Sequence, residues 1–162
     1  MGTANDNGGT ALIVRGFVAL LPGRSITLQP ANVMDTVPQL VHTRSVLAVR
    51  DLGVSTRFYV DVLGFTRDFG DGSDGWSFLS RGAFRVMLGE CGDATPAGEL
   101  GDHSWYVYVT VEGVDQLHRE VAARGAEILS APATKPWGLR EFSLRTPDGH
   151  RIAFGQPVSA AG

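Results

Sequence analysis

Hydrophobic and polar positions near the C-terminal end of the chain alternate in the way typical of a β-hairpin. Residues Glu141–Arg145 alternate between polar and apolar side chains, Thr146–Gly149 (TPDG) has the composition of a tight turn, and Arg151–Phe154 resumes an extended pattern. The pattern therefore predicts two strands joined by this turn.

The end of this hairpin repeats an earlier segment of the chain. Arg151–Gln156 (RIAFGQ) matches Arg85–Glu90 (RVMLGE) position by position. Similarity of this kind indicates an internal repeat.

The first half of the repeat begins with a strand and a helix. A strand pattern covers His42–Val49, Asp51 offers a helix N-cap, and Gly64 is suited to end the helix. Apolar residues at helical spacing fall between them, at Val54, Phe58 and Val62. Three strands are expected next, at Phe65–Phe69, Trp76–Ser80 and Phe84–Leu88, before a linker over Cys91–Asp102.

The same order then begins again. Trp105–Val111 predicts a strand, and a helix follows with Asp115 as its cap and Gly125 at its end. The further strands are expected at Ala126–Leu129, Glu141–Arg145 and Arg151–Phe154. The order predicts an α+β protein of two βαβββ modules. Because a module of this size cannot bury its own sheet face, we expect the two sheets to join edge to edge and curl around a shared cleft as one mixed sheet.

Composition limits the classes of function. The 162 residues are 43% hydrophobic and 19% charged, which suits one globular domain, and the net charge of −3 with no cluster of Lys or Arg argues against nucleic-acid binding. No apolar run reaches the ~18 residues that a membrane span needs. Cys91 is the single cysteine, so an intramolecular disulfide is excluded, and we expect a cytoplasmic protein.

The chain divides into three parts by pattern. We expect residues 1–36 to form an N-terminal extension that is flexible or loosely docked, residues 37–158 to form the domain, and residues 159–162 to form a tail.

Two segments carry a resemblance to a known family. VLAVRDLGVSTRFYVDVLGF opens the first module and PWGLREFSLRTPDGHRIAFGQP closes the second. In this order they resemble the vicinal oxygen chelate superfamily, which is also called the glyoxalase/bleomycin resistance/dioxygenase fold. That superfamily holds metal enzymes beside metal-free drug-binding proteins, so the resemblance implies the fold and leaves the function open.

The resemblance also indicates where a metal would be bound. The four positions that correspond to the ligands of the family's metal enzymes are Arg44, Met87, Tyr106 and Ala153. None of these is a usual ligand, so we expect no metal, no cofactor and no catalytic residue. The alternative is a metal-dependent lyase, isomerase, thiol transferase or dioxygenase whose atypical ligands include His42 and Glu90.

Strand parity predicts what lines the cleft instead. Residues two apart from the four positions face the same side, which adds Arg85, Tyr108 and Arg151. Aromatic, thioether and guanidinium groups suit stacking and shape fit better than water activation. Core packing of Tyr106 and Tyr108, and solvent exposure of the arginines, are the structural alternatives.

The closer resemblance is to bleomycin-resistance proteins. It is carried by FYVDVLGFTRDF, which ends at Phe69, by WYVYVTVEGVDQLH and by KPWGLREFSLRTPDGHRIAFGQ. In that family two aromatic side chains, from different subunits of a homodimer, hold the planar tail of the drug. By motif position these are Trp76 and Trp137, and packing is the alternative role for both.

Two further features bear on the ligand and on the dimer. The cationic drug would be attracted by acidic residues, for which the candidates are Asp68, Asp71, Asp74, Glu90 and Asp102. Ser45 stands where the family often has a proline at the crossover of swapped strands, which leaves strand exchange open.

The sequence therefore predicts a cytoplasmic, homodimeric binding protein that sequesters an aromatic, cationic antibiotic of the bleomycin type without altering it. A metal-free enzyme that uses Tyr106 or Glu141 in acid–base chemistry is a further possibility. The predicted ligand-binding residues are Trp76, Trp137, Tyr106, Tyr108, Arg44, Met87, Arg85 and Phe69.

Overall fold

The computed structural model describes residues 12–14, 17–19, 38–101 and 105–158. Contacts divide the chain into two units, Met1–Leu40 and Val41–Gly162. In the first unit, β1 (Leu12–Val14) pairs antiparallel with β2 (Phe17–Ala19). The rest of the expected extension, the expected tail, Asp102 and His103 lie outside the described residues.

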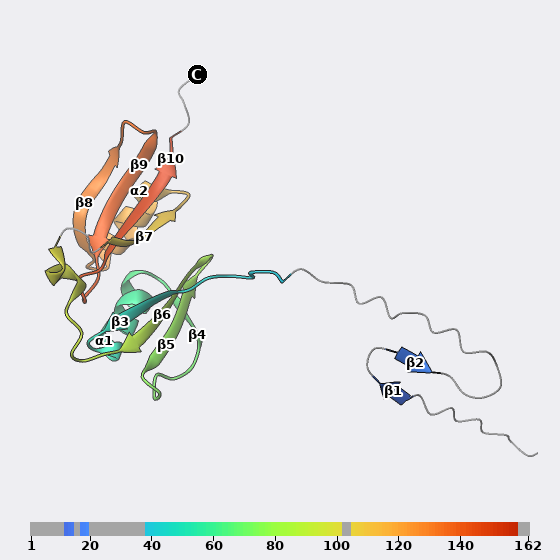
Figure 1. The fold of residues 1–162 in the computed structure, drawn as a ribbon. Helices are drawn as coiled ribbons and strands as arrows, with labels where there is room; N and C mark the ends of the chain where they lie inside the picture. Colours follow the sequence, from blue (N-terminus) through green and yellow to red (C-terminus); the bar gives the residue numbers. More distant parts are fainter. Residues whose placement is uncertain (1–11, 15–16, 20–37, 102–104, 159–162) are drawn as a thin grey trace, which may run out of the picture. The chain divides into compact units, whose positions relative to one another are not determined.

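The second unit contains two βαβββ modules, which confirms the predicted α+β class (Figure 1). The first consists of β3 (Ser45–Val49), α1 (Leu52–Arg57), η1 (Phe58–Val62), β4 (Thr66–Phe69), β5 (Trp76–Arg81) and β6 (Phe84–Glu90). After the 3₁₀ turn η2 (Ala97–Glu99), the second consists of β7 (Trp105–Thr110), α2 (Val114–Ala123), β8 (Glu127–Thr134), β9 (Leu139–Arg145) and β10 (Arg151–Pro157).

Each module forms a four-stranded mixed sheet of the same topology. The strand orders are β3-β6-β5-β4 and β7-β10-β9-β8, with the first strand of each module parallel to its last and the other pairs antiparallel. The hairpin β9–β10 matches the predicted one. Strand β8 runs past the predicted end at Leu129 and accommodates Pro132, because β8 is an edge strand with shifts in its register.

The two sheets do not join as expected. In the part of the chain that the structure describes, the backbone ladders run within each sheet and none links β3 to β7. A hollow of about 270 Å³, lined by Ser45, Arg85 and Tyr108 among others, separates the two edges. The expected single curled sheet is therefore two separate sheets.

The first helix begins and ends as predicted. The Asp51 carboxylate accepts the Val54 N–H at 2.8 Å, which satisfies one of the free donors of the first turn. The helix widens into the π-helical turn η1, and Gly64 then takes a φ of +70°, which favours glycine.

The second helix is capped differently from the prediction. Its N-cap is Gly113, and the Asp115 carboxylate instead accepts two hydrogen bonds of 2.7 Å from Arg140. The Gln156 Oε1 accepts the N–H groups of Gly113 at 2.9 Å and Val114 at 3.0 Å. A side chain from β10 therefore caps the helix, which local sequence patterns do not reveal.

The internal repeat explains this cap. Glu90 occupies the position in β6 that Gln156 occupies in β10, and its Oε1 accepts the Leu52 N–H at 3.3 Å. In both modules the side chain at this position of the last strand binds the first turn of the module's own helix.

Helices cover one face of each sheet. Helix α1 contacts β5 and β6, and α2 contacts β8, β9 and β10, so that α2 lies behind the second sheet in Figure 1. The covered faces share one hydrophobic core, which includes Leu47, Leu79, Leu88, Phe142, Leu144 and Ile152. Among the described residues, no helix is both long and apolar enough to cross a membrane.

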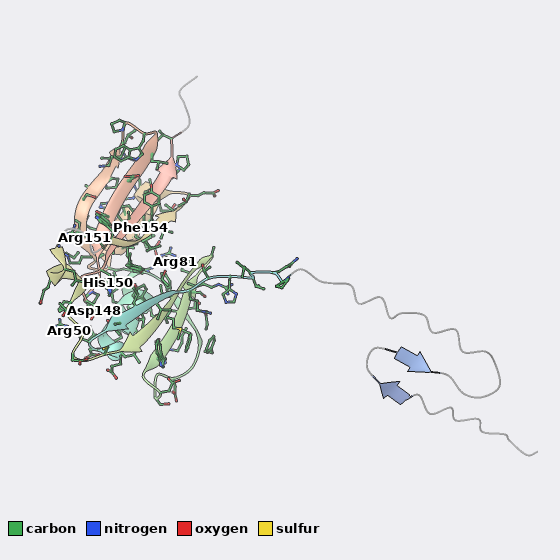
Figure 2. All side chains as sticks on the ribbon, in the orientation of Figure 1. Arg50, Arg81, Asp148, His150, Arg151 and Phe154 are labelled. Atoms are coloured by element: carbon green, nitrogen blue, oxygen red, sulfur yellow. The ribbon has the colours of Figure 1, made fainter. Side chains whose placement is uncertain are left out.

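Asp148 connects the two modules. Only 6% of its surface is exposed, and its carboxylate accepts the Ser55 hydroxyl at 2.5 Å and the Arg50 N–H at 2.9 Å (Figure 2). Its backbone carbonyl accepts the Ala97 N–H at 2.8 Å. The β9–β10 turn of the second module is thereby attached to the start of α1 in the first.

We predict that Asp148→Ala lowers the free energy of unfolding by about 2–3 kcal/mol, because it leaves the buried Ser55 hydroxyl and the Arg50 N–H without an acceptor. Urea denaturation measures this change. The control is Asp61→Ala at an exposed helical position, for which we expect a change within about 0.5 kcal/mol. Equal losses in the two variants would contradict the role of Asp148.

Candidate ligand-binding groove

An equivalent glycine lies beneath an aromatic ring in each module. A Cβ atom on Gly89 would lie 2.7 Å from the Trp76 ring, and one on Gly155 would overlap the Tyr108 hydroxyl. Glycine is needed at both positions because the rings lie directly on the sheet. The uncovered faces of the two sheets therefore have the same arrangement, in which an aromatic ring lies over a glycine of the last strand.

Large side chains fill the uncovered face of the first sheet. Phe69 and Phe78 stack with their ring centres 4.2 Å apart, and the Arg44 guanidinium lies 5.5 Å and 5.9 Å from these two ring centres. Arg44 also bonds Asp68 at 2.6 Å. Met87 lies opposite Phe78 in the β5–β6 register, so large side chains stand side by side on this face.

Small side chains occupy the corresponding positions of the second sheet. Ala153 replaces Met87 in the repeat, and Ser143 lies opposite Ala153 as Phe78 lies opposite Met87. The hydroxyls of Ser143 and Ser130 lie 2.7 Å apart. An open groove of about 470 Å³ results, which is large enough for a small molecule.

Two indoles border this groove near opposite ends of β10. Trp105, 48% exposed, lies beside the first residue of β10, and the Arg151 guanidinium is 5.6 Å from its ring centre (Figure 2). Trp137, 64% exposed, lies in the β8–β9 turn, near the last residues of β10.

The Glu141 carboxylate holds the side chains at the end of the groove where Trp137 lies. The Glu141 Oε1 accepts the Trp137 Nε1–H at 3.0 Å and the Tyr108 hydroxyl at 2.8 Å. Partial burial, together with the hydrogen bond to Glu141, raises the pKa of Tyr108 to about 12, so Tyr108 is a neutral donor at physiological pH.

Tyr106 lies outside the groove, although strand parity placed it with Tyr108. A bulge pairs Trp105 with Arg151 and Val107 with Ile152, which leaves Tyr106 as the extra residue. Its hydroxyl lies 2.6 Å from that of Tyr59, and burial raises its pKa. The parity prediction is wrong here because the bulge interrupts the period of two, and for the same reason it missed Trp105.

The remaining predicted residues lie on the first sheet. Trp76 and Phe69 belong to β5 and β4, two of the predicted strands, and Arg85 lines the hollow between the sheets beside Tyr108. Trp76 and Trp137 thus belong to different sheets. A ligand held between both indoles has to contact two modules, either of one chain or of two copies.

The acidic residues that were expected to attract a cation bind groups of their own module. Asp68 accepts hydrogen bonds from the Ser80 hydroxyl and from Arg44, and these bonds lower its pKa. Asp71 accepts the Ser73 N–H, Asp74 accepts the Trp76 N–H, and Glu90 accepts the Leu52 N–H at the start of α1.

Comparison with known proteins shows which family the chain belongs to. The family model of the Glyoxalase/Bleomycin resistance protein/Dioxygenase superfamily matches residues 39–154. The chain belongs to this superfamily. The family predicted from the sequence is thereby confirmed. No curated protein matches the chain at a significant level.

Several solved structures resemble the chain along most of its length. TioX from Micromonospora sp. ML1 is 28% identical, with 75% of this chain and 99% of TioX covered and a TM-score of 0.57. The bleomycin-binding protein from bleomycin-producing Streptomyces verticillus, complexed with copper(II)-bleomycin, is 23% identical, with 76% and 100% covered and a TM-score of 0.55. A glyoxalase/bleomycin resistance protein/dioxygenase from Nocardioides is 23% identical, with 80% and 92% covered and a TM-score of 0.61.

The residues considered for a metal site in this chain either have other partners or lie exposed at the surface. Arg44 is engaged with Asp68, Tyr106 lies in the module junction, and His42 is exposed. His118 and His150 pack against Phe142 and Tyr106. Within the described ranges, no three or more His, Cys, Asp or Glu residues are grouped so that they could hold a metal ion.

We predict that His150 makes stability depend on pH. Burial lowers its pKa from 6.5, so on acidification the unfolded chain takes up this proton first and the unfolding free energy falls. Stability should therefore rise with pH through the interval that ends at about 6.5 and then level off. In urea denaturation, His150→Asn should flatten this slope and the exposed His42→Asn should retain it; an unchanged slope in His150→Asn would refute the assignment.

Proposed function

We propose that this protein binds a planar aromatic small molecule in the groove of the second sheet and sequesters it unaltered. The observation that carries the proposal is a floor of small residues, Ser143 and Ala153, with Trp105 and Trp137 beside it. The ligand class is that of an aromatic antibiotic, in line with the bleomycin bound by the Streptomyces relative.

Stacking on the two indoles would supply most of the affinity. Indoles bury large areas at low entropic cost, and an exposed indole on a groove is typical of a binding site. Trp137 is already held by its hydrogen bond to Glu141, so its side chain loses little conformational entropy when a ligand binds.

The polar groups in the groove and beside it support binding rather than catalysis. Tyr108 is protonated at physiological pH, and Glu141 already accepts two hydrogen bonds. Tyr106, the other tyrosine considered for acid–base chemistry, lies in the module junction. Sequestration requires no chemical reaction, because a compound that is bound in the cytoplasm cannot reach its target.

We further propose that the binding form is a homodimer. Neither groove indole is covered by the chain's own helices, and the first sheet exposes Val46 and Phe69 on its uncovered face. If a second copy places this face over the groove, Trp76 and Trp137 from different copies can hold one ligand between them.

We predict that Trp137→Ala weakens binding of the aromatic ligand by about 1–3 kcal/mol, as expected for a lost stacking contact. Isothermal titration with metal-free bleomycin, and with 2-naphthamide as a small neutral probe, measures the affinity. Unchanged affinity for a probe that binds the parent protein would rule out the stacking role of Trp137.

We predict that Ala153→Met lowers the affinity for the same probes at least about tenfold, because it gives the second sheet the side chain that fills the first. The melting temperature should stay within a few degrees, since the methionine enters an open groove. Ala123→Met, at an exposed position of α2 away from the groove, is the matched control. If both variants bind as the parent does, the ligand lies elsewhere.

A further inference from the structure

We infer that the groove selects aromatic ligands whose edge carries a hydrogen-bond acceptor, such as a ring nitrogen or a carbonyl oxygen, and that the hydroxyl pair of Ser130 and Ser143 donates to this acceptor. The inference rests on the proposed function and names the class of ligand that the groove takes. It follows from the hydrogen atoms of the pair and from the residues that the first module has at the same positions.

The pair of Ser130 and Ser143 has one hydroxyl hydrogen more than it uses. The two residues lie opposite each other in the β8–β9 register, and both line the groove. Their hydroxyl oxygens are 2.7 Å apart, so one hydroxyl donates to the other. Neither hydroxyl has a further partner among the described residues. The serine that accepts this bond therefore keeps a hydrogen that can be donated to a ligand.

The position of the pair makes this hydrogen important for binding. Only 6% of the surface of Ser143 is exposed, and Ser143 lies next to Ala153 on the floor of the groove. A ligand that covers the floor displaces water from the pair. An acceptor on the ligand restores the lost hydrogen bond, whereas an all-carbon edge leaves the donor unpaired, which lowers the affinity.

The first module has an apolar pair at these positions. Phe69 and Phe78 occupy the register positions that Ser130 and Ser143 occupy in the second module, and their rings stack with centres 4.2 Å apart. Ala153 shows that alanine is enough to open space on this face. The two serines add hydroxyl groups that an open groove does not require, which favours a polar role toward the ligand.

A hydrogen bond between serines of neighbouring strands also stabilises a sheet. A pair with this structural role alone would affect the free energy of unfolding and would not discriminate between ligands of equal shape. Affinities for ligands that differ only in an acceptor atom therefore separate the two roles.

The test uses three probes of nearly equal shape: naphthalene, quinoline and isoquinoline. The last two replace one C–H group of naphthalene with a nitrogen that has a lone pair in the ring plane. NMR chemical-shift titration of the full-length protein, in mildly alkaline buffer where both nitrogens are unprotonated, measures the affinities. 2-Naphthamide is titrated beside them as the probe of the proposed function. Because a ring nitrogen also improves hydration of the free probe, the deciding quantity is the affinity ratio to naphthalene, compared between parent and variant.

The double variant Ser130→Ala, Ser143→Ala removes both hydroxyls and keeps the groove open. Removing both partners of a hydrogen bond leaves neither of them unpaired, so the variant should fold as the parent does. We expect the affinity ratio of quinoline or isoquinoline to naphthalene to fall at least about fivefold, as for the loss of one neutral hydrogen bond. Naphthalene itself should bind at least as tightly as it binds the parent.

The matched control is the double variant Thr66→Val, Ser80→Ala, which removes two hydroxyls from opposite positions of β4 and β5 in the first sheet. It should retain the ratio of the parent. An unchanged ratio in the groove variant, an equal fall in the control, or binding of 2-naphthamide without either nitrogen-containing probe would overturn the inference and leave aromatic binding intact. Failure of all four probes to bind the parent would overturn the proposed function as well.

Discussion

The arrangement of the domain depends on the buried carboxylate of Asp148. It comes from the turn of the second module and binds Ser55 and the Arg50 N–H of the first. A buried carboxylate is costly unless donors surround it, so the two modules are stable together only in a packing that brings these donors to the turn. The same junction brings Tyr106 to Tyr59 and packs the half-buried His150 against Tyr106. The position of the second sheet's first strand follows from this packing.

The groove arises from divergence within a repeat. Both modules keep a glycine under an aromatic ring and a polar side chain that caps the helix, at Gly89 and Glu90 in one and at Gly155 and Gln156 in the other. The residues that fill the uncovered face differ, because Met87 is replaced by Ala153. Close packing tolerates no such replacement in a core without loss of stability, but on an uncovered face it creates a site.

The charged side chains of this protein interact mainly with groups close to them. The acidic residues of the first module bind arginine, serine or backbone donors nearby, which leaves their contribution to a distant ligand small. The groove collects basic side chains from β9, β10 and the β8–β9 turn. The net charge of the chain therefore does not describe this groove, whose described lining holds more basic than acidic side chains.

Alternation, turn composition and the internal repeat were enough to predict the two βαβββ modules, the β9–β10 hairpin and the cap at Asp51, because each of these depends on neighbours in the chain. The family was predicted from the resemblance of two segments to known members. The cap of α2 by Gln156, the separation of the two sheets, the bulge at Tyr106 and the place of Trp105 were decided by tertiary structure. A bulge reverses which side chains face a groove, and it is set by packing against the other module. The Ser130–Ser143 hydroxyl pair likewise exists only in the register of two strands, where distant positions in the sequence become opposite each other.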